Sequence, residues 1–375
     1  MPPFCGNRYN ACESLLIIGA REFMPEPIVD LRSDTVTKPS AAMRKAMHDA
    51  EVGDDVYRED PTVNRLQDRA ADIFGREAGL YVVSGTMGNQ TAIKVLTRHG
   101  QEVICEDRCH IYNFEMAMVT AFSGVLPRTI HAEDGILTWD LIAPHVRKRN
   151  DHRARTGLIE IENTSNLAGG SVYPLTNTND IVDHAHAAGL PVHLDGARIF
   201  NAGVALGKPV VELTKGFDSV MFCLSKGLGA PVGSMLVGSK EFIEEARIVR
   251  KMLGGGMRQA GVLAAAGLIA LEESPKRLHI DHGNARYLAQ ELAQIPGIKI
   301  DAAKVVTNIL FFEVSGTGLT AYEISKLLAA QGVLANATNA QSIRMVTHLD
   351  VDRAGCERAL KALREVVVPR RAVAS

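Results

Sequence analysis

The sequence predicts an α/β protein in which a large, mostly parallel sheet is flanked by helices and a smaller α/β domain follows at the C-terminus. From residue 36 onward, apolar strand-like runs alternate with helical patterns, which is typical of parallel βαβ units. The pattern changes after Ser274-Pro275, where shorter elements follow a long Ala-rich helix. The length of 375 residues also favours two or three domains, at roughly 100–200 residues per domain.

The elements of the large domain can be placed in order along the chain. We expect helices at 86–99, 176–188 and 259–273, and strands at 80–84, 102–105, 158–162, 191–195, 219–224 and 232–237. Three consecutive glycines at 254–256 predict a turn before the last of these helices. Parallel sheets place ligands outside the carboxyl ends of their strands, so we expect a site near Gly85, Asp195 and residues 225–227.

The small domain is expected to hold strands at 298–300, 309–314 and 342–346, with helices at 320–331 and 351–366. We therefore expect a large domain over 28–275 and a small domain over 276–375. Residues 1–27 are expected to be a poorly ordered leader or a consequence of start assignment, because Met24 is a second plausible start. The apolar run at 14–20 is too short for a membrane span and lacks the basic region of a signal peptide.

Composition excludes several classes of function. The chain is 46% hydrophobic and 22% charged, with a formal net charge of −2, which is ordinary for a globular enzyme and gives no sign of nucleic-acid binding. No apolar stretch approaches the ~18–20 residues of a transmembrane helix. The six cysteines are scattered without a CxxC pair, and Cys105, Cys109 and His110 do not form a recognised zinc pattern. We therefore expect free thiols, no metal and a cytoplasmic location.

An aspartate and a lysine at neighbouring strand ends are the most informative pair. Asp195 closes the apolar run PVHLD, and Lys226 follows the apolar run DSVMFCLS 31 residues downstream. A pyridoxal phosphate (PLP) enzyme requires this pair: the lysine amine holds the cofactor as a Schiff base, and the carboxylate keeps the pyridine nitrogen protonated. The alternative is a strand-terminal aspartate and a surface lysine, each of which is common alone.

A glycine and a hydroxyl at a helix start predict an anion site. Residues 84–89 (SGTMGN) join an expected strand to an expected helix, so backbone N–H groups and the helix dipole point at one position, with the Thr86 hydroxyl as a further donor. An ordinary capped turn is the alternative. Because the sequence has neither GxGxxG after a strand nor GxxxxGK[ST], a nicotinamide or Walker site is disfavoured, and a cofactor phosphate beside Gly85 is favoured.

Histidines and arginines complete the candidate site. His110 follows a strand end, where its imidazole can stack on the cofactor ring and move a proton near neutral pH, or simply make one loop hydrogen bond. His152 lies in a charged stretch and is a weaker candidate. Arg198 and Arg344 are candidates for holding a substrate carboxylate, because a planar guanidinium binds that group with paired hydrogen bonds.

Several motifs together resemble the low-specificity L-threonine aldolases, which are fold-type I PLP enzymes of the aromatic amino-acid beta-eliminating lyase/threonine aldolase family. The resemblance runs from Asp30 to about Val367. It rests on residues 30–37 (DLRSDTVT), 53–57 (GDDVY), 84–89 (SGTMGN), 193–198 (HLDGAR), 225–228 (SKGL), 253–259 (LGGGMRQ) and 344–348 (RMVTH). One departure is Ser165, which stands in ENTSN where the family reads ENTHN.

The resemblance implies roles for the candidate residues. Lys226 would hold the cofactor, Asp195 would pair with its pyridinium, and His110 would stack on the ring and act as a base. Gly85 and Thr86 would bind the phosphate, and His152 would relay the proton of the β-hydroxyl through water. The base that takes this proton is left open between His110, His152 and the cofactor phosphate. The remaining assignments are a substrate carboxylate held by Ser33, Arg198 and Arg344, and a loop carrying Lys251 and Arg258 that reaches the cofactor and substrate of a neighbouring subunit.

The implied reaction is the retro-aldol cleavage of L-threonine and L-allo-threonine to glycine and acetaldehyde. The resemblance also implies a homotetramer, a dimer of dimers with sites at the subunit interface, which takes an amino-acid substrate and neither nucleic acid nor membrane. The alternatives are a phenylserine-type aldolase, a β-eliminating lyase that yields pyruvate and ammonia, and a non-catalytic PLP-fold binding protein.

Overall fold

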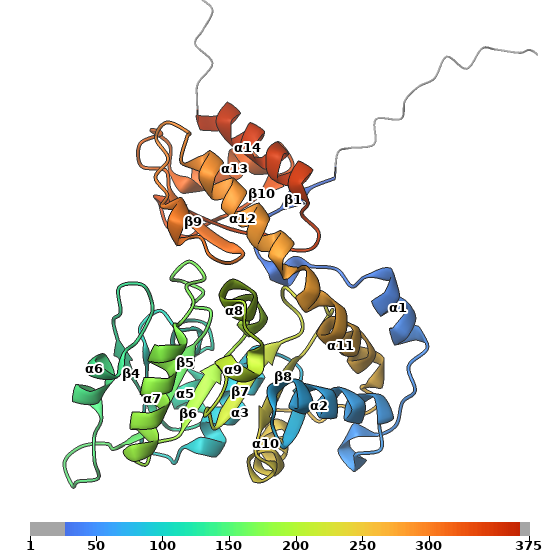
Figure 1. Ribbon diagram of the computed structural model, residues 1–375, viewed down its shortest axis with the longest axis vertical. Helices are drawn as coiled ribbons and strands as arrows, with labels where there is room; N and C mark the ends of the chain where they lie inside the picture. The colour runs from blue at the N-terminus through green and yellow to red at the C-terminus, as the bar shows by residue number, and fades with distance from the viewer. Residues whose placement is uncertain (1–26, 368–375) are drawn as a thin grey trace, which may run out of the picture.

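The computed structural model describes residues 27–367. The expected leader therefore lies outside the described residues except for Pro27. A large domain built around a central sheet forms the lower part of Figure 1, and a smaller domain, coloured orange and red, lies above it. In the described part of the chain, no helix has both the length and the hydrophobicity that crossing a membrane requires.

The large domain contains a seven-stranded sheet with the order β2-β8-β7-β6-β5-β3-β4. All neighbouring pairs are parallel except those of β8, which runs antiparallel to both β2 and β7. The prediction of a mostly parallel sheet is thus confirmed. The strands are β2 (Ala78–Val82), β3 (Glu102–Glu106), β4 (Leu126–Ile130), β5 (Thr156–Glu162), β6 (Val192–Asp195), β7 (Ser219–Cys223) and β8 (Ser234–Gly238).

Helices cover both faces of this sheet, because successive strand residues point to opposite sides. On β7, Val220 and Phe222 belong to the core shared with α2, α7, α8 and α11, whereas Met221 and Cys223 belong to the core shared with α3 and α10. The helices of this domain are α1 (Ala41–His48), α2 (Pro61–Phe74), α3 (Gly85–Leu96), α4 (His110–Asn113), α5 (Met118–Ala121), α6 (Trp139–Ile142), α7 (Leu175–Ala187), α8 (Ile199–Leu206), α9 (Val210–Leu213), α10 (Lys240–Met252) and α11 (Gly261–Glu273).

Local chemistry explains where α3 begins and how closely it packs. The Ser84 side chain caps the helix by accepting a hydrogen bond from the Met87 N–H at 3.2 Å. A Cβ atom on Gly88 would lie 2.6 Å from Cγ of Met221, so only glycine allows α3 to approach β7 this closely. The start of α3 is thereby held beside the end of β7, the strand that precedes Lys226.

The small domain combines short sheets with three helices. Strands β9 (Ile309–Glu313), β11 (Asn336–Ala337) and β12 (Ser342–Val346) form an antiparallel sheet in the order β11-β12-β9. Its helices are α12 (Leu278–Leu292), α13 (Ala321–Ala329) and α14 (Arg353–Val367). The expected strand at 298–300 is wrong, because that segment makes only an isolated bridge between Lys299 and Glu313.

The beginning of the described chain belongs to the small domain. β1 (Val29–Asp30) pairs in parallel with β10 (Val333–Leu334), and Val29 and Leu31 are buried in the small-domain core. The chain then enters the large domain through a short 3-10 helix (Asp34–Val36), so Ser33 and Asp34 lie where the two domains meet. The other 3-10 helices are Asp55–Tyr57, Ala143–His145, Ser274–Arg277 and Ala302–Lys304.

Candidate active site

Four strand ends define one edge of the large sheet. Asp195 is the last residue of β6, its register partner Glu162 is the last residue of β5, and Gly85 opens α3 just after β2. Lys226 follows the end of β7 by three residues. The carboxyl ends of these strands lie at the same edge, where α/β sheets bind ligands. The structure therefore brings Gly85, Asp195 and Lys226 to one edge of the sheet, as the sequence pattern predicts.

A chain of buried hydrogen bonds holds the Asp195 carboxylate. Asn89 donates to Oδ2 of Asp195 at 2.7 Å, and the Ala197 N–H donates to Oδ1 at 3.0 Å. The Asn89 amide oxygen lies 3.1 Å from Nε2 of His193, whose Nδ1 lies 2.8 Å from the Ser219 hydroxyl. Burial lowers the pKa of His193 to about 4, so its ring is neutral and orients Asn89 without adding charge.

Glu115 connects Asn89 to His110. It accepts hydrogen bonds from Asn89 at 2.8 Å and from Gln90 at 2.7 Å, and lies 2.7 Å from Nδ1 of His110. Burial lowers the pKa of His110, but the Glu115 hydrogen bond and the Asp195 charge outweigh it, so the pKa is raised overall. Because Nδ1 faces Glu115, Nε2 is the ring nitrogen left to meet a ligand.

Lys226 lies within electrostatic reach of both His110 and Asp34, since its charge opposes protonation of the first and lowers the pKa of the second. Asp34 is fully buried and accepts two hydrogen bonds from Arg198, at 2.7 Å from Nε and 2.6 Å from Nη2. Burial alone would raise the pKa of Asp34, but Arg198, Lys226 and Asn308 together bring it down to about 2. The pair is therefore ionised throughout the neutral range.

Arg344 extends from β12 toward this pair. Its Nη1 donates to the Asn166 side chain at 3.1 Å and its Nη2 donates to the Arg32 carbonyl at 3.1 Å. Burial and the nearby positive charge of Arg198 lower its pKa. The buried Arg198 guanidinium and the partly buried Arg344 guanidinium thus lie near one another, with the Asp34 carboxylate beside them where the two domains meet. This excess of positive charge suits a ligand carboxylate.

The expectation that Arg198 grips the substrate is altered by this geometry. Nε and one N–H of Nη2 of Arg198 are bound to Asp34, which leaves the second N–H of Nη2 and both N–H groups of Nη1, whereas each Nη of Arg344 retains a second N–H. Ser33 caps the adjoining 3-10 helix by accepting from the Thr35 N–H at 3.2 Å, and its own hydroxyl proton remains available.

The start of α3 offers an anion site. The N–H groups of Gly85 and Thr86 have no intrahelical acceptor, and among the described residues nothing else accepts from them. A Cβ on Gly85 would lie 3.0 Å from Sγ of Cys223, so glycine lets this turn pack against the end of β7. Backbone donors and a helix dipole therefore converge beside Lys226, as the motif predicts.

One expected site residue, His152, is not brought to this edge within one chain. His152 is exposed and precedes β5, whose 7 residues extend for about 20 Å before Glu162 is reached. It therefore lies at the opposite edge of the sheet, and the expectation that it relays a proton does not hold for a single chain. Lys251 and Arg258 are also exposed, and Arg258 pairs with Asp54 at 3.0 Å.

Residues 162–166 (ENTSN), in which Ser165 departs from the family pattern, contact the site through Glu162 and Asn166. Glu162 accepts hydrogen bonds from the backbone N–H groups of Asn166 at 2.7 Å and His110 at 2.6 Å. Ser165 is buried and its N–H bonds to the Ser171 carbonyl at 3.1 Å. The substitution at 165 thus lies beside the residue that contacts Arg344.

Burial and the Asp195 charge raise the pKa of Glu162 to about 7, against a usual value of 4.5. Between about pH 4.5 and 7 the folded protein therefore holds a proton that the unfolded chain has released. The contribution of Glu162 to the free energy of unfolding is thus complete below about pH 4.5, and it is lost as the pH rises through about 7. We expect wild type to lose up to about 3 kcal/mol relative to Glu162→Gln between about pH 5 and 7.

Urea denaturation at several pH values in this range measures that difference. Glu133→Gln, at an exposed carboxylate, is the matched control and should leave the pH dependence as in wild type. If the free energy of unfolding varied with pH in the same way for wild type and Glu162→Gln, the raised pKa of Glu162 would be contradicted.

The residues at this edge fit pyridoxal phosphate. Asp195 is buried with fixed orientation and can pair with a ring nitrogen, Lys226 can bind through its amine, and the start of α3 provides donors for a phosphate. Asn89, Glu115, Asp34 and Glu162 were not singled out from the sequence. Asn89 lies one turn after Gly85 in the SGTMGN motif, which is a signal that could have revealed it, whereas Asp34 was visible only as part of the DLRSDTVT motif.

Comparison with known proteins shows the family of the chain. A sequence profile of the beta-eliminating lyase family matches residues 30–315. The chain is 45% identical to low-specificity L-threonine aldolase 1 of Arabidopsis thaliana, covering 91% of this chain and 96% of that protein. It is 44% identical to the low specificity L-threonine aldolase of Escherichia coli K12, covering 87% and 95%.

The fold has a similar counterpart among solved structures. A threonine aldolase of Leishmania major superimposes with a TM-score of 0.76 at 20% identity, covering 90% of this chain and 99% of the other. The family profile and the close relatives extend over both domains and over the site. The chain therefore belongs to the beta-eliminating lyase family, within its low-specificity L-threonine aldolase group, and is a pyridoxal-phosphate-dependent lyase.

Proposed function

We propose that this enzyme is a low-specificity L-threonine aldolase that cleaves L-threonine and L-allo-threonine to glycine and acetaldehyde. The observation that carries the proposal is the meeting of Asp195, Lys226 and the Arg198–Arg344 pair at one sheet edge. High identity to curated threonine aldolases over 91% of the chain supports the choice of substrate.

The cofactor would be held by residues of the large domain. Lys226 binds it through the amine, Asp195 keeps a proton on the pyridine nitrogen, and the N–H groups of Gly85 and Thr86 bind the phosphate at the start of α3. His110 would contact the cofactor ring, and Glu115 fixes the orientation of its imidazole at 2.7 Å from Nδ1. When bound, pyridoxal phosphate supplies an electron sink for the pair released when the Cα–Cβ bond breaks.

The substrate carboxylate would be held where the two domains meet. Arg344 binds it with the free N–H groups of Nη1 and Nη2, and Nη1 of Arg198 and the Ser33 hydroxyl add donors. Asp34 holds Arg198 rigidly from the other side, at 2.6 Å and 2.7 Å. This clamp fixes the amino acid so that its Cα–Cβ bond can align for cleavage.

Proton transfer would fall to His110. Its Nε2 takes the proton of the β-hydroxyl as the Cα–Cβ bond breaks and acetaldehyde leaves, and Glu115 stabilises the imidazolium that forms. Return of a proton to Cα then gives glycine. His152 can take part only if a neighbouring copy presents it, because it lies at the opposite edge of its own sheet.

The proposal extends to assembly and location. Lys251 and Arg258 flank the loop at 254–256, whose Gly255 lies against Met87 at the start of α3, so both are placed on the surface near the phosphate turn. We propose that they serve the site of a second copy in a homotetramer built as a dimer of dimers. We also propose a large domain over 28–275, a small domain over 276–375, and a cytoplasmic enzyme of threonine catabolism and glycine biosynthesis without nucleic-acid or membrane partners.

A visible spectrum of the purified protein with L-threonine and L-allo-threonine tests the proposal. We expect a Schiff-base chromophore that changes when either amino acid is added, together with equal amounts of acetaldehyde and glycine. An α-keto acid and ammonia would instead identify a β-eliminating lyase, and strong preference for phenylserine would identify the other aldolase class. A colourless protein that binds but converts nothing would contradict enzymatic function.

A further inference from the structure

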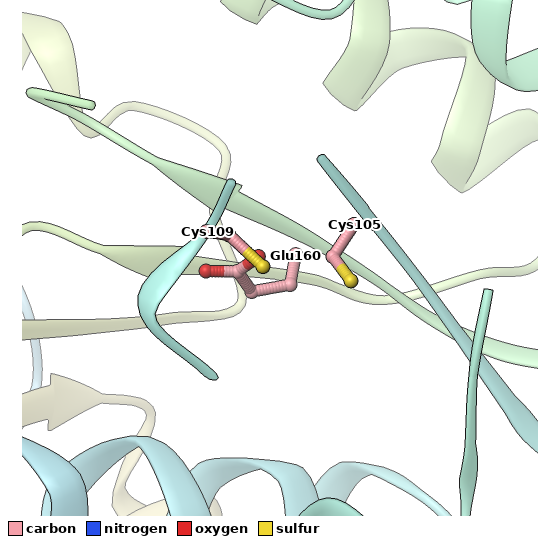
Figure 2. Close-up of side chains that lie close together, drawn as sticks. All are labelled: Cys105, Cys109 and Glu160. Atoms are coloured by element: carbon pink, nitrogen blue, oxygen red, sulfur yellow. The ribbon is translucent and has the colours of Figure 1, made fainter. Parts of the chain in front are cut away.

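Two cysteines and a glutamate form a buried group beside the proposed active site. Cys105 lies on β3, Glu160 lies on the adjacent strand β5, and Cys109 precedes the first residue of α4. Figure 2 shows the Cys109 sulfur beside the Glu160 carboxylate, with Cys105 entering from the neighbouring strand. One ligand atom from each residue lies within 4.8 Å of the other two, and all three side chains are buried.

Within the described part of the chain, the buried Glu160 carboxylate lacks the hydrogen-bond partners that a buried polar group normally has. The residue is 0% exposed, and neither of its carboxylate oxygens has a hydrogen-bond partner among the described residues. Burying a carboxylate without compensation is costly, and such groups usually carry a counter-charge or coordinate a metal. Among the described residues no cation pairs with it, whereas the buried Glu102 on β3 pairs with Arg128 at 2.5 Å.

The donor set selects the kind of ion. Thiolates are soft ligands, whereas Mg²⁺ and Ca²⁺ prefer oxygen ligands alone. Zn²⁺ binds cysteine sulfur at about 2.3 Å and carboxylate oxygen at about 2.0–2.2 Å, so the ligand atoms around one ion are mutually close, as they are here. Without an ion, burial raises the pKa of Glu160, and Cys105 together with burial raises that of Cys109.

We propose that Cys105, Cys109 and Glu160 bind one Zn²⁺ per chain. Binding requires both cysteines as thiolates, so the ion replaces the thiol protons and no oxidation occurs. Three protein ligands leave a fourth position for water. The proposal does not depend on which amino acid the enzyme cleaves, and it replaces the sequence-based expectation that the chain binds no metal.

The site would act as a structural clip close to the reaction centre. Cys109 immediately precedes His110, and Glu160 lies two residues before Glu162 on the same strand face, so an ion would tie α4 to β3 and β5. The His110 N–H already bonds to Glu162 at 2.6 Å. The ion would therefore restrain the segment that positions the imidazole, without touching the substrate.

Metal analysis of the full-length holoenzyme tests the proposal. Protein is produced in zinc-supplemented medium, kept reduced, and washed with a weak chelator before zinc and protein are quantified. We expect close to one zinc per chain in wild type and in Cys356→Ala, the matched control at a buried cysteine of the small-domain core. Glu160→Gln and Cys105→Ala should each lower the zinc content at least about tenfold.

Cobalt substitution gives a readout that needs no variant. Co²⁺ supplied in place of zinc should produce sulfur-to-metal charge-transfer bands and intense d–d bands at wavelengths longer than the cofactor absorbs. A folded, reduced wild-type protein without metal and without these bands would overturn the proposal. Zinc retained at the wild-type level by both Glu160→Gln and Cys105→Ala would also overturn the proposal. So would a metal-free protein whose mass shows a disulfide between Cys105 and Cys109.

Discussion

Lys226→Ala is expected to lower the rate of threonine cleavage by at least about a thousandfold, the largest loss expected of any single substitution. The reason is that the amine is the proposed covalent attachment point for the cofactor, and among residues 27–367 no other lysine follows a strand end at this edge of the sheet. The side chain is only half-buried, so its removal leaves no unpaired buried group. We therefore expect the free energy of unfolding without cofactor to change by less than about 1 kcal/mol.

Steady-state acetaldehyde release and the absorption spectrum measure the effect together. Lys215→Ala removes an exposed lysine of the same domain and is the matched control; it should retain wild-type rate and spectrum. Loss of the Schiff-base chromophore together with loss of rate would show that Lys226 attaches the cofactor. Substantial turnover by Lys226→Ala would overturn the assignment of this lysine.

Local sequence patterns predict those site residues that stand at the end of a single strand. Gly85, Asp195 and Lys226 each stand at or just after the end of an apolar run, so their common edge follows from the parallel order of the strands. By contrast, Asp34 and Arg198 are 164 residues apart and meet only because the chain starts in the small domain and enters the large one beside α8. No short-range pattern records such a contact.

Direction along a strand explains why His152 lies away from the other candidate residues within one chain. The histidine stands four residues before β5, and a site at the carboxyl end of that strand is then separated from it by the whole strand. Two residues that are close in sequence are far apart in space when an extended strand separates them, because each strand residue adds about 3.3 Å. Only a neighbouring copy can return this side chain to an active site.

The fold was predictable where burial made the pattern strong. Strand β5 is buried along its whole length and was expected, whereas β4, which contains Pro127 and Arg128 and has a largely half-exposed surface, was not. Likewise, nothing in the apolar run of β8 indicates that it runs antiparallel to both neighbours. The direction of a fully buried strand depends on how the preceding connection returns, which composition does not reveal.

Asp34→Asn is expected to destabilise the protein by about 3–5 kcal/mol, because it leaves the Arg198 guanidinium buried without its counter-charge. The pair is separated by 2.6 Å, and its side chains are 5% and 0% exposed. The exposed pair Lys45–Asp49 has the same separation of 2.6 Å with side chains 79% and 50% exposed. Asp49→Asn is therefore the matched control, and we expect it to cost less than about 1 kcal/mol.

A double variant separates the burial of charge from the role of Arg198 at the site. Asp34→Asn combined with Arg198→Met removes both charges, so most of the stability lost in Asp34→Asn should return in chemical denaturation. Threonine cleavage should stay at least about tenfold below wild type with a raised KM, because Arg198 no longer contributes to the carboxylate clamp. Equal destabilisation of the single and double variants would show that lost packing, not an unpaired charge, sets the cost. Recovery of activity with stability would show that Asp34 and Arg198 serve the fold alone and that Arg344 holds the substrate unaided.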